Sequence, residues 1–413
     1  MEIRPILSAL MRSKVALILI GLQIALTLAI VCNALFIIRQ RMDTMGRPSG
    51  MDEANTFTVA SFGFGDSFNT KNAFTEDLAL LRGLPGVKDV SPMNTVPMSQ
   101  SGWSEGVSLK ADQKTATTST AIYFVDEHGL DAYGLRLVAG RNFKPEEITV
   151  RDARSSDWPP VLMVTRALAE KLFPGEDAVG KQINISGDPS KPMQTIIGVI
   201  DALQVPWPES FIVNGDHNAP SYSTLVPQMT PYGTRTAYLV RTEPGRRDEL
   251  MKTVEQKLTD SNHSRIVRNI KSIEAIRAEC YREDRAMMII LLTVIVCLLT
   301  ITALGIVGMA SFWVTQRTKQ IGTRRALGAT RGAILRYFLT ENFLITSGGL
   351  ALGALLTYGL SFWLMAHQQE AKLLPWHYVP VGFVSLWALG QLAVLGPATR
   401  ASRVPPAVAT RSV

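Results

Sequence analysis

Cysteine and histidine are scarce in this chain of 413 residues, which contains three cysteines and five histidines. Cys32 and Cys297 lie inside apolar runs, and Cys280 lies just outside one. Because no two cysteines are close in sequence, neither a disulfide framework nor a metal cluster is predicted. The histidines are scattered without an HExxH motif, so a metal hydrolase has no support. We predict no metal site and no catalytic residue.

A complete nucleotide-binding loop is also lacking. Residues 175–182 read Gly-Glu-Asp-Ala-Val-Gly-Lys-Gln, which places Gln182 where a P-loop needs a Ser or Thr hydroxyl for Mg²⁺. The stretch follows a predicted helix at 166–173 instead of a strand. We expect a helix stop, a turn and the start of a strand here, and no cofactor bound by this chain.

Charge is absent from three long apolar runs, 15–38, 286–314 and 378–395, and the run 337–366 contains a single charged residue, Glu341. About 20 helical residues cross the hydrocarbon core of a bilayer, so each run is predicted to span it, the last near the short limit. The first run is too long for the apolar core of a secretory signal and is predicted to be a retained anchor. The fold class is therefore a membrane protein with four transmembrane helices, one followed by three.

Acidic residues are missing from the loop between the second and third runs, while six basic residues lie in it. The positive-inside rule places this loop, the N-terminus and the C-terminal tail in the cytoplasm. From residue 314 onward ten basic residues stand against two acids, an excess of eight that accounts for the net charge of +7. The positive net charge therefore reflects the membrane topology of the chain, and no nucleic-acid partner is predicted. The cytoplasmic cations are Arg4, Arg12, Lys14, Arg317, Lys319, Arg324, Arg325, Arg331, Arg336, Arg400, Arg403 and Arg411.

Three segments follow from this layout: 1–40 with the first span, an extracytoplasmic domain at 41–284, and a membrane domain at 285–413 with a cytoplasmic loop at about 315–336 and a tail at 397–413. The extracytoplasmic domain is predicted to be mixed α/β, with Thr75 as the N-cap of a helix at 75–82. Residues 206–231, rich in Pro, Gly, Asn and Ser, are predicted to form a surface excursion between two α/β sets. Residues 272–284 are predicted to run as a continuous helical stalk into the second span. The predicted strands are 57–60, 87–90, 121–125, 161–164, 195–200, 237–241 and 265–267, and the other predicted helices are 166–173 and 246–258.

Polar and small residues within the third apolar run are candidates for function. Glu341 lies close to the basic loop, where Arg336 or Arg317 could pair with it. Gly349 and Gly353 form a small-xxx-small pattern that lets another helix approach closely, within the chain or across a dimer. Gly348 precedes this pattern.

The stretch 316–329, Gln-Arg-Thr-Lys-Gln-Ile-Gly-Thr-Arg-Arg-Ala-Leu-Gly-Ala, resembles the signature of MacB/FtsX-like ABC transporter permeases. The tail at 397–411 and the blocks at 134–143 and 172–181 resemble the ending and the periplasmic core of the same family. Gln320 stands where that family usually has Glu, and Thr323 where it often has an aliphatic residue. The resemblance implies that the loop docks on an ATPase through Arg317, Lys319, Gln320, Ile321, Gly322, Arg324, Arg325, Ala326, Leu327 and Gly328.

The resemblance implies the permease subunit of a drug or peptide export complex in a bacterial inner membrane. A separate cytoplasmic ABC ATPase would bind ATP and Mg²⁺ and drive movement of the periplasmic domain. A second copy or a paralogous permease is expected as a partner in the lipid bilayer, and participation of a periplasmic adaptor and an outer-membrane channel is left open.

Three other functions are weighed against export. One is lipoprotein release, because the lipoprotein-sorting permeases share the layout. Another is activation of a cell-wall hydrolase, although the outer domain is larger than that group usually has. The third is a membrane-anchored enzyme using Ser67 as nucleophile with His128 and Asp126, whose hydrogen bonds spacing alone does not show.

Overall fold

A computed structural model describes most of the chain. It covers residues 14–65, 68–113, 115–151, 157–185, 187–188, 190–208, 216, 218–230, 233–367 and 373–405. Ser67 and the cations at 4, 12 and 411 lie outside these residues, as do 368–372 of the loop before the fourth span and 406–413 of the predicted tail. The chain divides into two compact units, a membrane unit (Met1–Asp43 and Asp284–Val413) and an outer unit (Thr44–Glu283).

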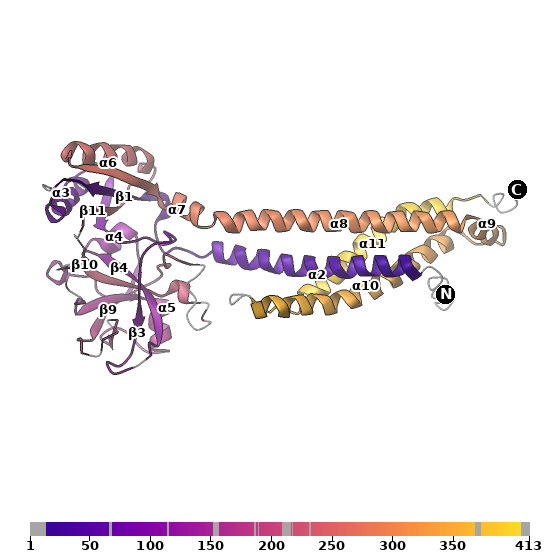
Figure 1. Cartoon of the computed structure of the whole chain (residues 1–413), viewed down its shortest axis with the longest axis horizontal. Coiled ribbons are helices and arrows are strands. Elements are labelled where there is room, and N and C mark those ends of the chain that lie inside the picture. Colours follow the sequence, from indigo (N-terminus) through magenta and orange to yellow (C-terminus); the bar gives the residue numbers. More distant parts are fainter. Residues whose placement is uncertain are drawn as a thin grey trace. The chain divides into compact units, whose positions relative to one another are not determined.

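Four long apolar helices in the membrane unit confirm the predicted spans. They are the longest ribbons in Figure 1. Each helix extends beyond the apolar run that predicted it, because polar residues at its ends continue the same backbone hydrogen bonding. The helices are α2 (Lys14–Met45), α8 (Arg282–Gln316), α10 (Arg331–His367) and α11 (Tyr378–Ser402).

A four-stranded sheet in the outer unit has the order β12-β1-β11-β2, and each neighbouring pair is antiparallel. Its apolar side chains, with Phe57, Tyr238 and Val240 fully buried, pack under α3 (Thr70–Arg82) and α6 (Arg247–Ser261). Figure 1 shows both helices beside this sheet. The strands are β1 (Thr56–Gly63), β2 (Val87–Pro92), β11 (Arg235–Thr242) and β12 (Arg265–Ser272).

A second sheet has the order β3-β4-β10-β7-β9-β5 and carries α5 (Arg166–Leu172). Two short strands attach at its side, β6 to β10 and β8 to β9. The other elements of the outer unit are β3 (Trp103–Val107), β4 (Thr118–Val125), α4 (Gly129–Tyr133), β5 (Leu137–Gly140), β6 (Thr149–Val150), β7 (Val161–Thr165), β8 (Gln182–Ile183), β9 (Gln194–Ile200), β10 (Ser223–Met229), α7 (Ile273–Cys280) and the 3-10 turns Glu53–Asn55, Pro145–Glu147 and Ala219–Ser221.

The second half of the segment 206–231 corrects the predicted surface excursion, whereas 209–215, 217 and 231 lie outside the described residues. This half contains β10, a buried strand that pairs in parallel with β4 and antiparallel with β7. Pro227 is tolerated because the pairing with β7 has already ended at Leu225, so its missing N–H breaks no bond of that ladder. The predicted division into two consecutive α/β sets is also wrong, since β11 and β12 return to pair with β1.

Two local predictions on helices need correction. Helix α3 begins at Thr70 because the Asn69 side chain accepts a hydrogen bond from the Asn72 amide, and Thr75 lies inside the helix. The predicted helical stalk is present but is not continuous. Helix α7 ends at Cys280, Tyr281 after it has a ψ of 20° that is not helical, and α8 begins at Arg282.

Tyr281 interrupts the stalk because its side chain belongs to the core of the outer unit. The ring is 1% exposed, and its hydroxyl accepts a 3.0 Å hydrogen bond from Nε2 of Gln204. Continuing α7 would carry this ring out of that core, so the chain turns here before entering α8.

The segment 175–182 forms the predicted turn and strand start. Helix α5 ends at Leu172, Gly175 and Gly180 have φ of +72° and +86°, and β8 begins at Gln182. Lys181 forms an ion pair with Glu176 and lies 4.6 Å from the centre of the Phe173 ring, so its ammonium group is engaged locally. Nothing in this geometry resembles a phosphate cradle.

Candidate coupling site

The helix α9 (Thr318–Ala326) lies between α8 and α10. It is separated from α8 by Arg317, whose φ of −101° and ψ of 11° leave the helical region. Its sequence contains no acid, and Gly328, with φ of +96°, closes the helix. The basic loop predicted from the sequence is therefore a short cationic helix held between two spans.

Arg317 pairs with Glu341 on α10. Of the two predicted partners of this acid, Arg317 and Arg336, the structure therefore shows Arg317. Nη1 of Arg317 lies 2.9 Å and 3.0 Å from the two carboxylate oxygens and also donates to the Tyr337 hydroxyl at 3.3 Å. The Glu341 side chain is 1% exposed, whereas that of Arg317 is 17% exposed. The pair fixes the angle at which the chain leaves α8 and enters α9.

The remaining predicted coupling residues divide between two sides of α9. Ile321 and Gly322 are buried and face the bundle, and Arg325 is half-buried. The other members, which are exposed, are Lys319, Gln320, Arg324, Ala326, Leu327 and Gly328. Leu327 is 83% exposed although it is aliphatic. A cationic helix that ends in an exposed aliphatic side chain has the composition of a protein-docking surface.

Arg325 holds the tail and does not project outward. Its Nη1 donates a 2.6 Å hydrogen bond to the carbonyl oxygen of Val404, just beyond the end of α11. Of the two adjacent arginines predicted to contact the ATPase, Arg324 is exposed and Arg325 is half-buried. A substitution of Arg325 would disturb the packing of α9 on the tail.

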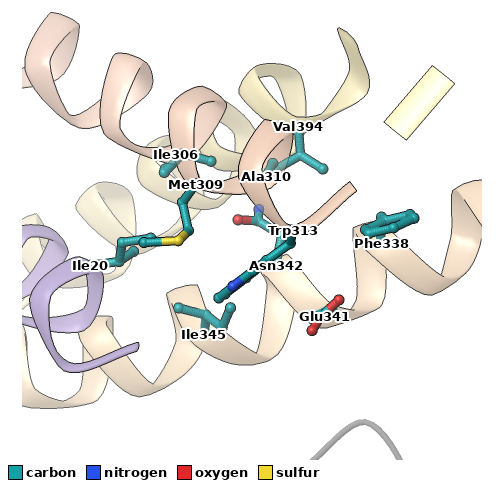
Figure 2. Close-up of a pocket in the computed structure, with 10 residues that line it drawn as sticks. All are labelled: Ile20, Ile306, Met309, Ala310, Trp313, Phe338, Glu341, Asn342, Ile345 and Val394. Atoms are coloured by element: carbon teal, nitrogen blue, oxygen red, sulfur yellow. The ribbon is translucent and has the colours of Figure 1, made fainter. Parts of the chain in front are cut away.

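A small, mainly apolar pocket lies beside Glu341, where side chains of all four spans converge (Figure 2). Nε1 of Trp313 and Nδ2 of Asn342 are buried there without a hydrogen-bond partner, and both residues line the pocket. The cavity is about 20 Å³, enough for a single water molecule. The sequence marked this position only through the adjacent polar residues Glu341 and Asn342 within an apolar run.

Gly349 and Gly353 allow α10 to approach α2 closely. A Cβ atom would lie 2.9 Å from the carbonyl oxygen of Gly21 at Gly349, and 3.0 Å from Cα of Ala25 at Gly353. Gly348 has nothing within 4 Å at that position and is exposed. The small-xxx-small pattern therefore serves a contact within the chain.

Two arginines at the other end of α2 are neutralised locally. Arg41 donates to Asp284 at 2.8 Å and Arg39 pairs with Asp43 at 3.2 Å. These acids explain why basic residues occur on the side of the first span opposite to the basic loop.

Two residues of the enzyme alternative meet only through the backbone, because the His128 amide donates a 3.1 Å hydrogen bond to Oδ1 of Asp126. Nδ1 of His128 contacts Asp89 at 2.9 Å, whereas Asp126 accepts side-chain hydrogen bonds from Ser91 and Arg82. The imidazole is therefore not paired with the Asp126 carboxylate, and Ser67 lies outside the described residues.

These features define a class of protein: four spans, an α/β domain between the first two, and a short cationic helix between the second and third. Two family models cover this arrangement. The MacB-like periplasmic core domain matches residues 15–259, and the FtsX-like permease C-terminal domain matches residues 292–406. The chain therefore belongs to the MacB/FtsX-like family of ABC transporter permeases.

The chain is 24% identical over 345 residues to the uncharacterized ABC transporter permease YknZ of Bacillus subtilis, covering 83% of this chain and 80% of that protein. It is 26% identical over 311 residues to the macrolide export ATP-binding/permease protein MacB of Neisseria gonorrhoeae, covering 74% of this chain. It spans only 44% of the length of that protein. Among solved structures, the periplasmic region of MacB from Actinobacillus actinomycetemcomitans is 17% identical with a TM-score of 0.34, covering 57% of this chain and 97% of that one.

Tyr281 and Asn342 are the residues of interest that sequence reasoning missed. Tyr281 ends the stalk helix through a long-range contact with Gln204, a contact that no local pattern announces. A single amide such as Asn342 in an apolar run is common at helix interfaces, so the sequence alone does not mark it as functional.

Proposed function

We propose that this chain is the permease subunit of an ABC-type complex in a bacterial inner membrane that exports a drug-like or peptide-like substrate. Helix α9 and both termini lie in the cytoplasm and the outer unit lies in the periplasm, as the basic residues of α9 and the tail require. A separate ATPase binds ATP and Mg²⁺. The name of the MacB relatives favours export over lipoprotein release or hydrolase activation.

The observation that carries this proposal is the two-sided arrangement of α9. Arg317, Ile321, Gly322 and Arg325 hold the helix on the bundle, which leaves Lys319, Thr323, Ala326, Leu327 and Gly328 to contact the ATPase. A cationic surface suits an acidic groove through charge-assisted hydrogen bonds. Since Gln320 and Thr323 replace residues usual in the family, Lys319 and Leu327 are the principal contacts of this chain.

Helix α8 connects this surface to the outer unit. It is an unbroken helix of 35 residues, about 50 Å long, with a non-helical residue before it at Tyr281 and after it at Arg317. Each of these residues is anchored, Tyr281 by Gln204 and Arg317 by Glu341. A rigid helix between two anchored joints transmits a displacement of α9 to the outer unit without a transmembrane pore.

Nucleotide drives this displacement only if the ATPase binds one arrangement of α9 more tightly in one nucleotide state. The working unit contains a second permease, a copy of this chain or a paralogue, so that two α9 helices meet the two halves of an ATPase dimer. Whether an adaptor and an outer-membrane channel complete the path is decided by the partners that co-purify.

Co-purification of the tagged full-length chain in mild detergent, with mass spectrometry of its partners, tests the proposal. The variant Lys319→Glu/Leu327→Ala should lose at least nine-tenths of the bound ATPase. The control Lys257→Glu/Val150→Ala makes the same two kinds of change on exposed residues of the outer unit and should retain it. An ATPase that both variants retain equally, or none with the wild type, would contradict the proposal.

A further inference from the structure

A second pocket, of about 140 Å³, lies between α9 and the start of α10. Its polar lining comes from Arg317, Gln320, Arg324 and Tyr337. Its apolar lining includes Ile321, Ile334 and Phe338. Gln320 and Arg324 line this pocket, whereas Lys319 and Leu327, the principal contacts proposed for the ATPase, do not.

The pocket carries one positive charge without a compensating acid. Arg317 is neutralised by Glu341. Arg324 has no acidic partner among the described residues, and its guanidinium carbon lies 5.1 Å from the centre of the Tyr337 ring. Gln320, beside it, is neutral but supplies amide donors. The donor set therefore suits a singly charged anion such as a phosphodiester.

The depth of the pocket follows from the residues that line it. Arg317 follows the apolar run of α8, and Tyr337 and Phe338 begin the apolar run of α10. The pocket therefore lies at the headgroup end of these two apolar runs, where polar and apolar side chains line it together. A free anion would use only the polar side chains, whereas a phospholipid would use both.

We propose that this pocket binds the phosphodiester of an anionic phospholipid of the phosphatidylglycerol type. Arg324 forms the principal ionic contact, Gln320 and Tyr337 donate hydrogen bonds, and Ile334 and Phe338 contact the glycerol and the upper acyl chain. A bound headgroup would brace α9 against α10 beside the Arg317–Glu341 pair. The lipid would thus set the resting position of α9. This role rests on the proposed function, whereas the binding of the lipid does not depend on it.

Native mass spectrometry of the purified full-length chain, without any ATPase, tests the binding. Phosphatidylglycerol should be retained about fivefold more tightly than phosphatidylcholine, a factor equivalent to about 1 kcal/mol for one basic residue. Arg324→Gln should abolish this preference, and Gln320→Glu should reduce it by placing an acid beside Arg324. The control Lys319→Gln removes the same charge from the other surface of α9 and should leave the preference unchanged.

Four results would overturn the proposal. One is equal retention of the two lipids by the wild type. Another is an equal loss of preference in Arg324→Gln and Lys319→Gln, which would show a diffuse surface potential. The third is displacement of phosphatidylglycerol by millimolar inorganic phosphate, which would show a site for free anions. If Arg324→Gln lost ATPase binding but kept the lipid preference, the pocket would belong to the partner protein.

Discussion

Two buried ion pairs, one in each unit, differ in how completely they are enclosed. In the outer unit Arg265 and Asp77 lie 2.5 Å apart with side chains that are 1% and 2% exposed. The Tyr238 hydroxyl donates to Asp77 at 2.8 Å, and the Leu258 carbonyl accepts from Arg265 at 2.9 Å. Burial and the nearby Asp77 carboxylate raise the pKa of Tyr238, so the phenol keeps the proton that it donates.

In the membrane unit the Arg317–Glu341 pair is enclosed on one side only. Arg317 lines the pocket between α9 and α10, and the unpartnered polar atoms of Trp313 and Asn342 lie next to Glu341. A fully satisfied network holds a single arrangement, whereas a partly satisfied one lowers the cost of a second arrangement. On the proposed function, we therefore expect the outer unit to move as a rigid body and α9 to be the place where the chain changes shape.

Removal of one member of the outer pair should have the largest effect. Asp77→Leu leaves the Arg265 guanidinium buried without a counter-charge and should lower the free energy of unfolding of the outer unit by about 3–5 kcal/mol. Urea unfolding of the full-length chain, followed by proteolysis, measures this change. Glu279→Gln breaks an exposed pair with Lys271 and should cost under about 1 kcal/mol. Similar losses for the two variants would contradict the enclosure of the outer pair.

Glu341→Gln should lower the free energy of unfolding less than Asp77→Leu does, but it should lower ATP-dependent output more. Arg317 retains access to the open pocket, so we expect a loss of about 1–3 kcal/mol. ATP-dependent output should fall while the ATPase remains bound. Comparison with Arg317→Gln and the double variant isolates the pair energy. A loss as large as that of Asp77→Leu would show that the two pairs are equivalent.

Gly349→Ala should loosen the contact between α2 and α10. The added methyl group meets the Gly21 carbonyl at 2.9 Å, and overpacking of this kind costs about 1–3 kcal/mol. Gly348→Ala makes the same change one residue earlier, where nothing lies within 4 Å, and should be neutral or slightly stabilising. Thermal unfolding in detergent compares the two variants, and the same midpoint for both would exclude the close approach.

Asn342→Leu should have the smallest effect on stability, and unlike the variants above it should not lower stability. It replaces an amide whose Nδ2 is buried without a partner by an apolar side chain of similar size, so the unfolding midpoint should stay the same or rise by a few degrees. If the unpartnered amide facilitates movement of α9, ATP-dependent output should fall at the same time. A marked loss of stability would show that Asn342 is fully hydrogen-bonded.

Sequence patterns predicted the spans, most strands and the position of the cationic segment between the second and third spans, because each depends on local periodicity or charge. They failed where a long-range contact decides the structure. β10 was missed because Pro227 and its polar neighbours resemble a loop until the end of β7 is known. The break at Tyr281 depends on Gln204, and the inward turn of Arg325 depends on the Val404 carbonyl. A basic motif alone does not tell which of its arginines is exposed.

Hydrogen exchange of the assembled complex in nucleotide-free and ATP-bound states tests most directly whether α9 moves and α8 transmits the movement. We expect ATP to change amide exchange both in α9 and around Tyr281, and we expect the change around Tyr281 to disappear in Glu341→Gln. Exchange that changes in α9 but not at Tyr281, or that is the same in both nucleotide states, would contradict coupling through the joints at Arg317 and Tyr281.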